Sequence, residues 1–362
     1  MRAMKSVAKK SVAVRPAAVR TAAAALAVIV AVGLTTACNR GSDNGRAGKA
    51  GPPVGVDLPR SDSDFWNAYA KYLRASERRA EVELLPASNS QNDIGKLVSN
   101  ALVFANTGAK AIVMAPQDTG AVSGALKRLA DRKVPVISVD TRPDAKAGPV
   151  YMVVRADNRA YGTKACAFLG QRLGGKGKVA ELQGDLKSVN GRDRSEAFAD
   201  CMAKDFPGIT VFPLPTDWKG DVASHKLQTL LTQHPDIDGI YLQAGGVFLD
   251  PTLALLRQKG LLRPAGAPGH ISVVSNDGIP QELDAIRRRE IDATVSQPAD
   301  LYAEYALYYA RAAAEGRRFS PGRTGHGSTV VSIPNGLEDR LPAPLVTLEN
   351  VDDASLWANG AR

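Results

Sequence analysis

From Val54 onward, short runs of apolar and β-branched residues alternate with longer segments in which apolar residues recur every three or four positions. We interpret the short runs as strands. They are Val82–Leu85, Ala111–Met114, Val134–Val139, Val150–Val154, Val179–Leu182, Ile209–Phe212, Ile237–Leu242, Ile271–Ser275 and Ile291–Ser296. Because continuous apolar strands between amphipathic helices form parallel sheets covered on both faces, the pattern predicts an α/β fold.

Two of the helical segments have a particularly regular apolar stripe. The first contains Ile94, Leu97, Val98, Ala101, Leu102 and Ala105. The second contains Tyr302, Tyr305, Ala306, Tyr309, Ala312 and Ala313. Spacings of three and four residues place these side chains on one face of a helix, so each segment is predicted to cover a sheet.

Nine or ten strand–helix units are too many for one open sheet of ordinary size. We therefore predict two doubly wound parallel-sheet domains, with a single (β/α)₈ barrel as the alternative.

The first residues have the composition of a secretory signal. A basic segment precedes an apolar run, Thr21 to Leu34, that is too short to span a bilayer, and small residues follow it. Residues 1–37 are therefore predicted to be a signal peptide. Cys38 after small residues resembles a bacterial lipobox, although Leu34 lies four residues before the cysteine rather than three. We predict lipidation of Cys38, with an ordinary export signal and an incidental cysteine as the alternative.

Charge and composition fit an exported chain attached at its N-terminus. Residues 1–37 carry six positive charges and no negative one, so without them the net charge falls from +9 to +3. The remainder has no Lys/Arg block, which argues against a nucleic-acid partner. Residues 38–53 are rich in Gly, Pro and polar residues and are predicted to be a flexible tether. We predict an extracytoplasmic protein, lipid-anchored to the cell membrane and touching it only through that lipid.

The other two cysteines form an even pair in an oxidising compartment. Cys166 and Cys201 lie in predicted helices that flank one strand. A disulfide between them is the favoured interpretation, and two buried free thiols are the alternative.

Polar and aromatic residues gather where ligands bind in such folds. In parallel α/β sheets the binding crevice lies at the carboxyl ends of the strands, near helix N-termini. Asp140, Asp277 and Gln297 follow predicted strands, Phe65-Trp66 opens the first helix, and Trp218 lies between a strand and its helix.

Six separated motifs, in this order, resemble the type I periplasmic binding proteins of sugar ABC transporters, the ribose/galactose-binding group. They are Ser63-Asp64-Phe65-Trp66, Val139-Asp140, Gly191-Arg192-Asp193-Arg194, Thr216-Asp217-Trp218, Asn276-Asp277-Gly278 and Ala293-Thr294-Val295-Ser296-Gln297. The likeness runs from about Val54 to about Arg317 and resumes near Leu345.

The resemblance implies two lobes joined by three hinge crossovers that close over a sugar. The N-terminal lobe would comprise residues 54–156 and 298–345, and the C-terminal lobe residues 157–297 and 346–362. The ligand-binding set would be three stacking aromatic residues and four hydrogen-bonding residues. These are Phe65, Trp66, Trp218, Asp140, Arg192, Asp277 and Gln297. Rings cover the C–H faces of a sugar, and carboxylates, guanidinium groups and amides bond its hydroxyls.

The implied function is a non-enzymatic receptor, a monomer that delivers a sugar or sugar-like polyol to an ABC permease. A sensor that presents its ligand to a membrane receptor kinase is the main alternative. A DNA-binding repressor or an enzyme on the same scaffold is a weaker alternative. No cofactor is predicted. No metal site is predicted either, because the four histidines share no ligand spacing. The near phosphate-loop sequence Gly170–Gly177 lies between a helix and a strand, so we interpret it as a tight turn.

Two segments depart from the family pattern. Gln243-Ala244-Gly245-Gly246 follows a strand where sugar binders commonly place Asn-Asp, so a smaller or less hydroxylated ligand is expected. The Gly/Pro-rich stretch from Ser320 to Pro344 is longer than the usual hinge return, and the sequence suggests no function for it.

Overall fold

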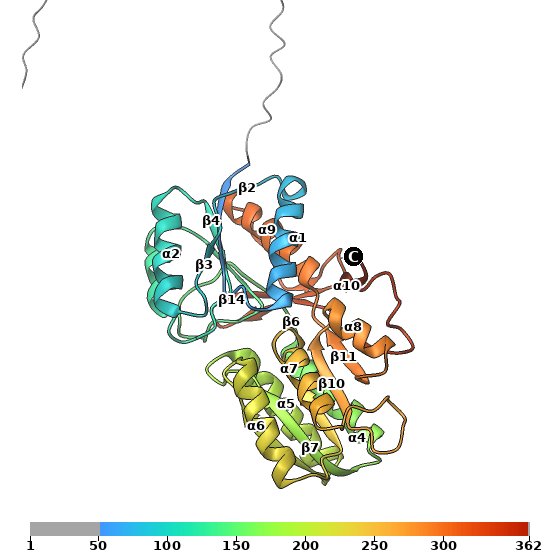
Figure 1. Cartoon of the computed structure of the whole chain (residues 1–362). Helices are drawn as coiled ribbons and strands as arrows, with labels where there is room; N and C mark the ends of the chain where they lie inside the picture. The colour runs from blue at the N-terminus through green and yellow to red at the C-terminus, as the bar shows by residue number, and fades with distance from the viewer. Residues whose placement is uncertain (1–50, 361–362) are drawn as a thin grey trace, which may run out of the picture. The chain divides into compact units, whose positions relative to one another are not determined.

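The computed structural model of the chain describes residues 51–360 and contains two α/β lobes, each built on a mostly parallel sheet (Figure 1). Signal peptide, Cys38 and most of the predicted tether lie outside these residues. Two doubly wound α/β domains are therefore confirmed, and the single barrel is excluded. Within residues 51–360 no helix is long and apolar enough to cross a membrane.

The N-terminal lobe contains a nine-stranded sheet, ordered β12-β13-β14-β6-β5-β4-β1-β2, with β3 also paired to β1. Its first elements are β1 (Pro53–Leu58), α1 (Asp64–Ala80), β2 (Glu83–Leu84), β3 (Ser88–Asn89), α2 (Ile94–Asn106), β4 (Ala111–Met114), α3 (Ser123–Asp131), β5 (Val136–Val139) and β6 (Met152–Ala156). The chain later returns to this lobe as α9 (Ala299–Ala314), β12 (Gly322–Arg323), β13 (Thr329–Ile333) and β14 (Gly336–Leu341). Helices α1 and α9 pack side by side, and α9 lies against β4, β5 and β6 (Figure 1).

The C-terminal lobe contains a six-stranded sheet, ordered β15-β11-β10-β9-β7-β8. Its elements are α4 (Asn158–Arg172), β7 (Lys176–Gln183), α5 (Val189–Asp205), β8 (Gly208–Pro215), α6 (Gly220–Gln233), β9 (Gly239–Leu242), α7 (Gly245–Gln258), β10 (Ser272–Asp277), α8 (Pro280–Arg287), β11 (Ala293–Ser296), β15 (Leu345–Thr347) and α10 (Trp357–Gly360). Only β15 is antiparallel to its neighbour.

The chain passes between the two sheets three times, from β6 to α4, from β11 to α9 and from β14 to β15. Leu345, which the sequence analysis assigned to the N-terminal lobe, pairs with Val295 in the second sheet. The C-terminal segment also contacts the first lobe, because Tyr72 Oη donates to the Trp357 carbonyl oxygen at 3.0 Å.

The Ser320–Pro344 stretch is an extension of the first sheet. Strand β14 adds parallel to β6, and β12 and β13 continue outward as antiparallel strands. The fully buried Asp339 carboxylate fixes the extension to α9, since it accepts hydrogen bonds from Tyr309 Oη at 3.0 Å and from Ser328, and His326 Nε2 lies 2.8 Å away. The sequence analysis did not predict these strands, because they are short and their strand character comes from pairing beside β6.

Helices α4 and α5 are covalently linked. A disulfide joins Cys166 to Cys201 across a Cα–Cα distance of 6.2 Å, so the two thiols are not free. The Gly170–Gly177 segment forms the turn between α4 and β7, where Gly174 and Gly175 have φ angles of 62° and 75°. Such positive angles favour glycine.

Candidate functional site

A cavity of about 40 Å³ lies between the two lobes at the carboxyl ends of their strands. We call it the cleft pocket. It is lined by Arg60, Ser63, Phe65, Trp66, Gln117, Asp140, Asn190, Arg194, Trp218, Ala244, Val247, Asp277 and Gln297. Six of the seven residues predicted to bind ligand are among them, and the exception is Arg192.

The first turn of α1 supplies the aromatic wall of the N-terminal lobe. Phe65 and Trp66 meet edge to face, with ring centroids 5.2 Å apart. The Phe65 ring also packs edge to face on Tyr302 and Trp357, and it is only 2 % exposed. Phe65 is therefore a core residue and a pocket residue at once, which holds its ring in a fixed orientation.

Asp140 provides a buried carboxylate just after β5. Its φ angle of 64° lies in the left-handed region, where Asp is among the few tolerated side chains. Asn190 Nδ2 donates to Asp140 Oδ2 at 2.7 Å, whereas Oδ1 is buried and has no hydrogen-bond partner. Burial raises the pKa of Asp140 above its usual value, and the opposing charges of Arg194 and Arg155 lower it only in part. The hydrogen-bonding capacity of this carboxylate is therefore only partly used within the protein.

Asp277 is the last residue of β10 and provides a second carboxylate from the opposite lobe. The Gly246 N–H at the start of α7 donates to its Oδ2 at 2.9 Å. Burial raises the pKa of Asp277, while Arg194 and the Gly246 N–H act in the opposite direction. Behind it, burial and the nearby Asp277 charge also raise the pKa of Glu282. The charges of Arg194 and Arg60 offset the effect of burial on Asp277 only in part.

Arg194, rather than Arg192, brings a guanidinium to the pocket. Arg194 is 3 % exposed, and its Nε and Nη2 donate to Asn158 Oδ1 at 2.6 Å and to Gln297 Oε1 at 2.8 Å. A third bond goes from Nη1 to the Gln243 carbonyl oxygen. These contacts fix both Arg194 and the predicted site residue Gln297.

Arg192 lies at the edge of the lobes, outside the cleft pocket. Its Nη1 donates to the carbonyl oxygens of Leu186 and Lys187, and its Nη2 lies 3.2 Å from Asp144 Oδ1 in the other lobe. Of the two arginines, only Arg194 lines the cleft pocket, and Arg192, which the sequence analysis assigned to the ligand-binding set, does not. Helical geometry explains the difference, because residues two apart face opposite sides of α5.

Trp218 provides the aromatic wall of the C-terminal lobe. Its ring stacks on Phe248 with an interplanar angle of 14°, and the Arg194 guanidinium lies 5.7 Å from the Trp218 ring centroid. A Cβ on Gly184 would approach the indole to 2.0 Å, so the ring needs a glycine beneath it. The indole Nε1 is buried without a partner and can donate to a ligand.

The sequence analysis missed several pocket residues: Arg60, Ser63, Gln117, Asn190 and Arg194. Asn190 and Arg194 were detectable, because they are four residues apart and share one face of α5. Arg60 and Gln117 also follow strands, β1 and β4, but the strand β1 was not predicted, and Gln117 lies further from the end of its strand than Asp140 does. Ala244 lines the pocket where the family was expected to offer a polar side chain, and Val247 lies one turn further along α7.

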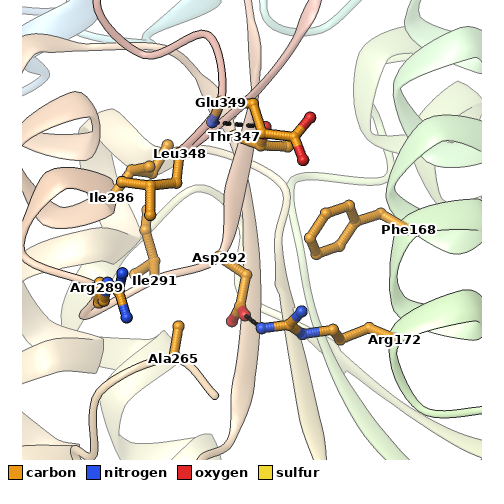
Figure 2. A pocket seen from close by; sticks show the side chains of 10 residues that line it. All are labelled: Phe168, Arg172, Ala265, Ile286, Arg289, Ile291, Asp292, Thr347, Leu348 and Glu349. Carbon is orange, nitrogen blue, oxygen red and sulfur yellow. Dashed lines mark hydrogen bonds and ion pairs between the residues drawn. The ribbon is translucent and has the colours of Figure 1, made fainter.

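A larger cavity of about 620 Å³ lies in the C-terminal lobe and contains none of the predicted site residues (Figure 2). We call it the distal cavity. It is lined by Phe168, Arg172, Ala265, Ile286, Arg289, Ile291, Asp292, Thr347, Leu348 and Glu349. Ile291 and Asp292 precede β11, whereas Gln297 of the cleft pocket follows it, so the two cavities lie at opposite ends of that strand.

The buried polar group of the distal cavity is already engaged within the protein. Asp292 Oδ2 lies 2.7 Å from His270 Nε2 and accepts from the Val273 N–H at 2.9 Å. Arg172 Nη2 lies 3.2 Å from Asp292 Oδ1, and a dashed line in Figure 2 marks this ion pair. These contacts hold the segments before β10 and β11 together. They leave Asp292 fewer free hydrogen-bonding positions for a ligand.

Two lobes with aromatic and ionised groups on facing walls define a solute-binding protein that holds its ligand between domains. The chain belongs to the family described as periplasmic binding protein domain, whose sequence model matches residues 54–318. Within residues 51–360, no group of three or more His, Cys, Asp or Glu side chains is arranged to hold a metal ion.

Relatives include binding proteins for a sugar and for a polyol. The chain is 29 % identical over 212 residues to the ribose import binding protein RbsB of Salmonella typhimurium, covering 59 % of this chain and 68 % of that protein. It is 26 % identical over 300 residues to the xylitol-binding protein of Mycolicibacterium smegmatis, covering 81 % and 80 %.

Solved structures share the fold. The Caulobacter myo-inositol binding protein bound to myo-inositol matches with a TM-score of 0.72 and 24 % identity, covering 85 % of this chain and 97 % of that one. An ABC transporter solute-binding protein from Mycobacterium smegmatis with bound glycerol matches with a TM-score of 0.71 and 23 % identity, covering 83 % and 96 %.

Proposed function

We propose that the chain captures a sugar or polyol in the cleft pocket and delivers it to the permease of an ABC importer. The observation that carries this proposal is the convergence of Asp140, Asp277, Arg194 and the rings of Trp66 and Trp218 on one buried cavity. The names of the relatives agree with it, and none of those reported above supports the sensor alternative.

The chemistry of the pocket suits a neutral, hydroxylated ligand. The lining combines two carboxyl groups, Asp140 and Asp277, with two guanidinium groups, Arg60 and Arg194, so acidic and basic groups are matched in number. Asp140 Oδ1 accepts and Trp218 Nε1 donates, so each would gain a partner when a hydroxyl group binds. Leaving such groups unpaired costs about 1–3 kcal/mol each, which favours ligands that match both.

The small volume of the pocket favours a compact ligand and a change of shape on binding. A cavity of about 40 Å³ holds little more than a few water molecules. We therefore expect the lobes to separate for entry and to close around the solute, driven by the preference of the solute for the closed form. The absence of a polar side chain at Ala244 is consistent with a small polyol or a furanose.

We further propose that the protein works outside the cytoplasm as a monomer, held to the membrane by lipid on Cys38, and that it binds without turnover. The Cys166–Cys201 disulfide supports an oxidising location. Mass spectrometry of the N-terminal peptide from membranes would test lipidation. Conversion of a bound solute that Asp140→Ala abolishes would contradict the non-enzymatic role.

Calorimetry tests the central proposal. The full chain is titrated with ribose, xylitol, myo-inositol, glycerol, arabinose and allose, and mass spectrometry identifies any solute that co-purifies. Saturable binding of one of these, weakened in Asp277→Ala, is the expected result. If no sugar or polyol binds and none co-purifies, the proposed function is wrong.

A further inference from the structure

Arg60 is a buried cation that joins the two lobes at the cleft pocket. It follows β1 in the N-terminal lobe and is 8 % exposed. Its Nε and Nη2 donate to the two carboxylate oxygens of Asp62 at 2.5 Å and 2.8 Å. Its Nη1 donates to the Trp218 carbonyl oxygen in the C-terminal lobe at 3.1 Å. The two-pronged contact with Asp62 fixes the plane of the guanidinium and so directs Nη1 toward Trp218.

The turn that carries Trp218 is anchored to its own lobe mainly at its ends. Thr216 bonds to the Gln183 carbonyl oxygen through both its N–H and its hydroxyl, and the Lys219 N–H donates to the Thr216 carbonyl oxygen. Between these anchors, Asp217 and Trp218 have φ angles of 53° and 55°. Left-handed backbone is uncommon for a bulky residue such as Trp, so this conformation must be maintained by its surroundings.

Packing fixes the ring of Trp218, but the contact from Arg60 acts on its backbone. The indole lies over Gly184 and stacks on Phe248, both in the C-terminal lobe. The bond from Arg60 is different, because it comes from the other lobe and exists only when the lobes are together. The position of the Trp218 turn is thereby coupled to closure.

We propose that Arg60 is a positioning residue for ligand capture, which holds the Trp218 turn against the cleft pocket when the lobes close. This inference rests on the proposed function for its biological meaning. Because of the bond from Arg60, Trp218 reaches its position beside the pocket only in the closed state. A solute that contacts Trp218 would therefore stabilise the closed state and dissociate slowly.

Fluorine NMR of the full chain labelled with 5-fluorotryptophan tests the inference, with spectra recorded both without ligand and with ribose, xylitol or myo-inositol added to favour closure. The chain has three tryptophans, and Trp218→Phe identifies the Trp218 signal. We expect Arg60→Gln to move the Trp218 signal by more than its line width and to leave those of Trp66 and Trp357 in place. Asp62→Asn, at an exposed side chain, should move the same signal in the same direction. The control is Arg159→Gln on α4, whose partners Glu196 and Asp200 belong to the same lobe.

A Trp218 signal that is unchanged in both Arg60→Gln and Asp62→Asn, with and without added solute, would overturn the inference. Dissociation kinetics with ribose, xylitol and myo-inositol as probes give the functional readout, and Arg60→Gln should release a bound probe about tenfold faster. If the wild-type chain binds none of these probes or any other solute, the proposed function fails. The fluorine result would still decide the role of Arg60, so the two can fail separately.

Discussion

The cleft pocket and the distal cavity lie at opposite ends of β11, and the proposed binding site is the smaller of the two. The distal cavity is about 620 Å³ and the cleft pocket about 40 Å³. In the distal cavity, the buried carboxylate of Asp292 contacts a histidine, an N–H group and an arginine. In the cleft pocket, Asp140 Oδ1 and Trp218 Nε1 have no partner. Asp292 Oδ1 also lacks a hydrogen-bond partner, but the Arg172 guanidinium lies 3.2 Å from it. The two cavities therefore differ in that the unpartnered polar groups of the cleft pocket come from both lobes.

The largest difference between the two cavities should follow from removing one carboxylate in each. Asp277→Ala should weaken binding of the solute identified by calorimetry about 100-fold or more, because it removes a buried charged acceptor. Asp292→Asn should leave the affinity within about twofold while lowering the stability of the fold, since it breaks the contacts with His270 and Arg172. Titration calorimetry and thermal unfolding separate the two effects. Equal loss of affinity in both variants would contradict the comparison.

Loss of the disulfide should reduce stability without changing the cleft pocket. The bond joins α4, which lines the distal cavity, to α5, which carries Arg194. Cys166→Ala with Cys201→Ala should cost about 2–4 kcal/mol of unfolding free energy, measured by urea titration, because the unfolded chain gains freedom. Solute affinity at 25 °C should stay within about threefold. A large loss of affinity would mean that the bond also shapes the site.

A paired test of α5 compares Arg192 with Arg194. Arg194→Lys keeps the charge but cannot reproduce the three bonds to Asn158, Gln243 and Gln297, so affinity should fall about 30-fold. Arg192→Lys should change the affinity less than about threefold, because its partners lie at the exposed edge. The reverse order of effects would restore the prediction made from the sequence.

The smallest expected effect is on pH dependence and comes from the layer behind the cleft pocket. Burial raises the pKa of Glu181 from 4.5 to about 8, against hydrogen bonds from Gln243 and Gln183. The unfolded chain therefore loses this proton first, and stability from the neutral carboxyl is complete below pH 4.5 and declines toward pH 8. In Glu181→Gln, the fall in melting temperature between pH 5 and pH 8 should be shallower than in wild type. It should not vanish, because Glu282 titrates in the same direction. Parallel curves would show that Glu181 does not titrate there.

The sequence specified the regular parts of the fold well. Apolar runs such as Ala111–Met114 became β4, and the stripe from Ile94 to Ala105 became α2, since burial on one face or both determines these elements. It missed β12 to β14, because their strand character comes from pairing beside β6 rather than from a local pattern. Edge strands depend on the neighbour they join, and that neighbour lies far away in the chain.

The pocket residues also divide into those that a local pattern predicts and those that depend on distant contacts. Asp140, Asp277 and Gln297 were placed correctly at the pocket because strand ends of a parallel sheet share one edge. Arg192 was misplaced by two residues, which in a helix reverses the direction of a side chain. Arg60 was missed because its role depends on Trp218, 158 residues away, and no local spacing encodes that contact.

The three connections between the sheets limit how this protein can move. Two bodies joined by one strand can twist and slide freely, but three separate strands resist torsion and sliding and leave bending as the softest motion. The permease would therefore meet a receptor whose shape varies along essentially one coordinate. The angle between the lobes would then be the main structural difference by which the permease distinguishes the solute-bound protein from the empty one.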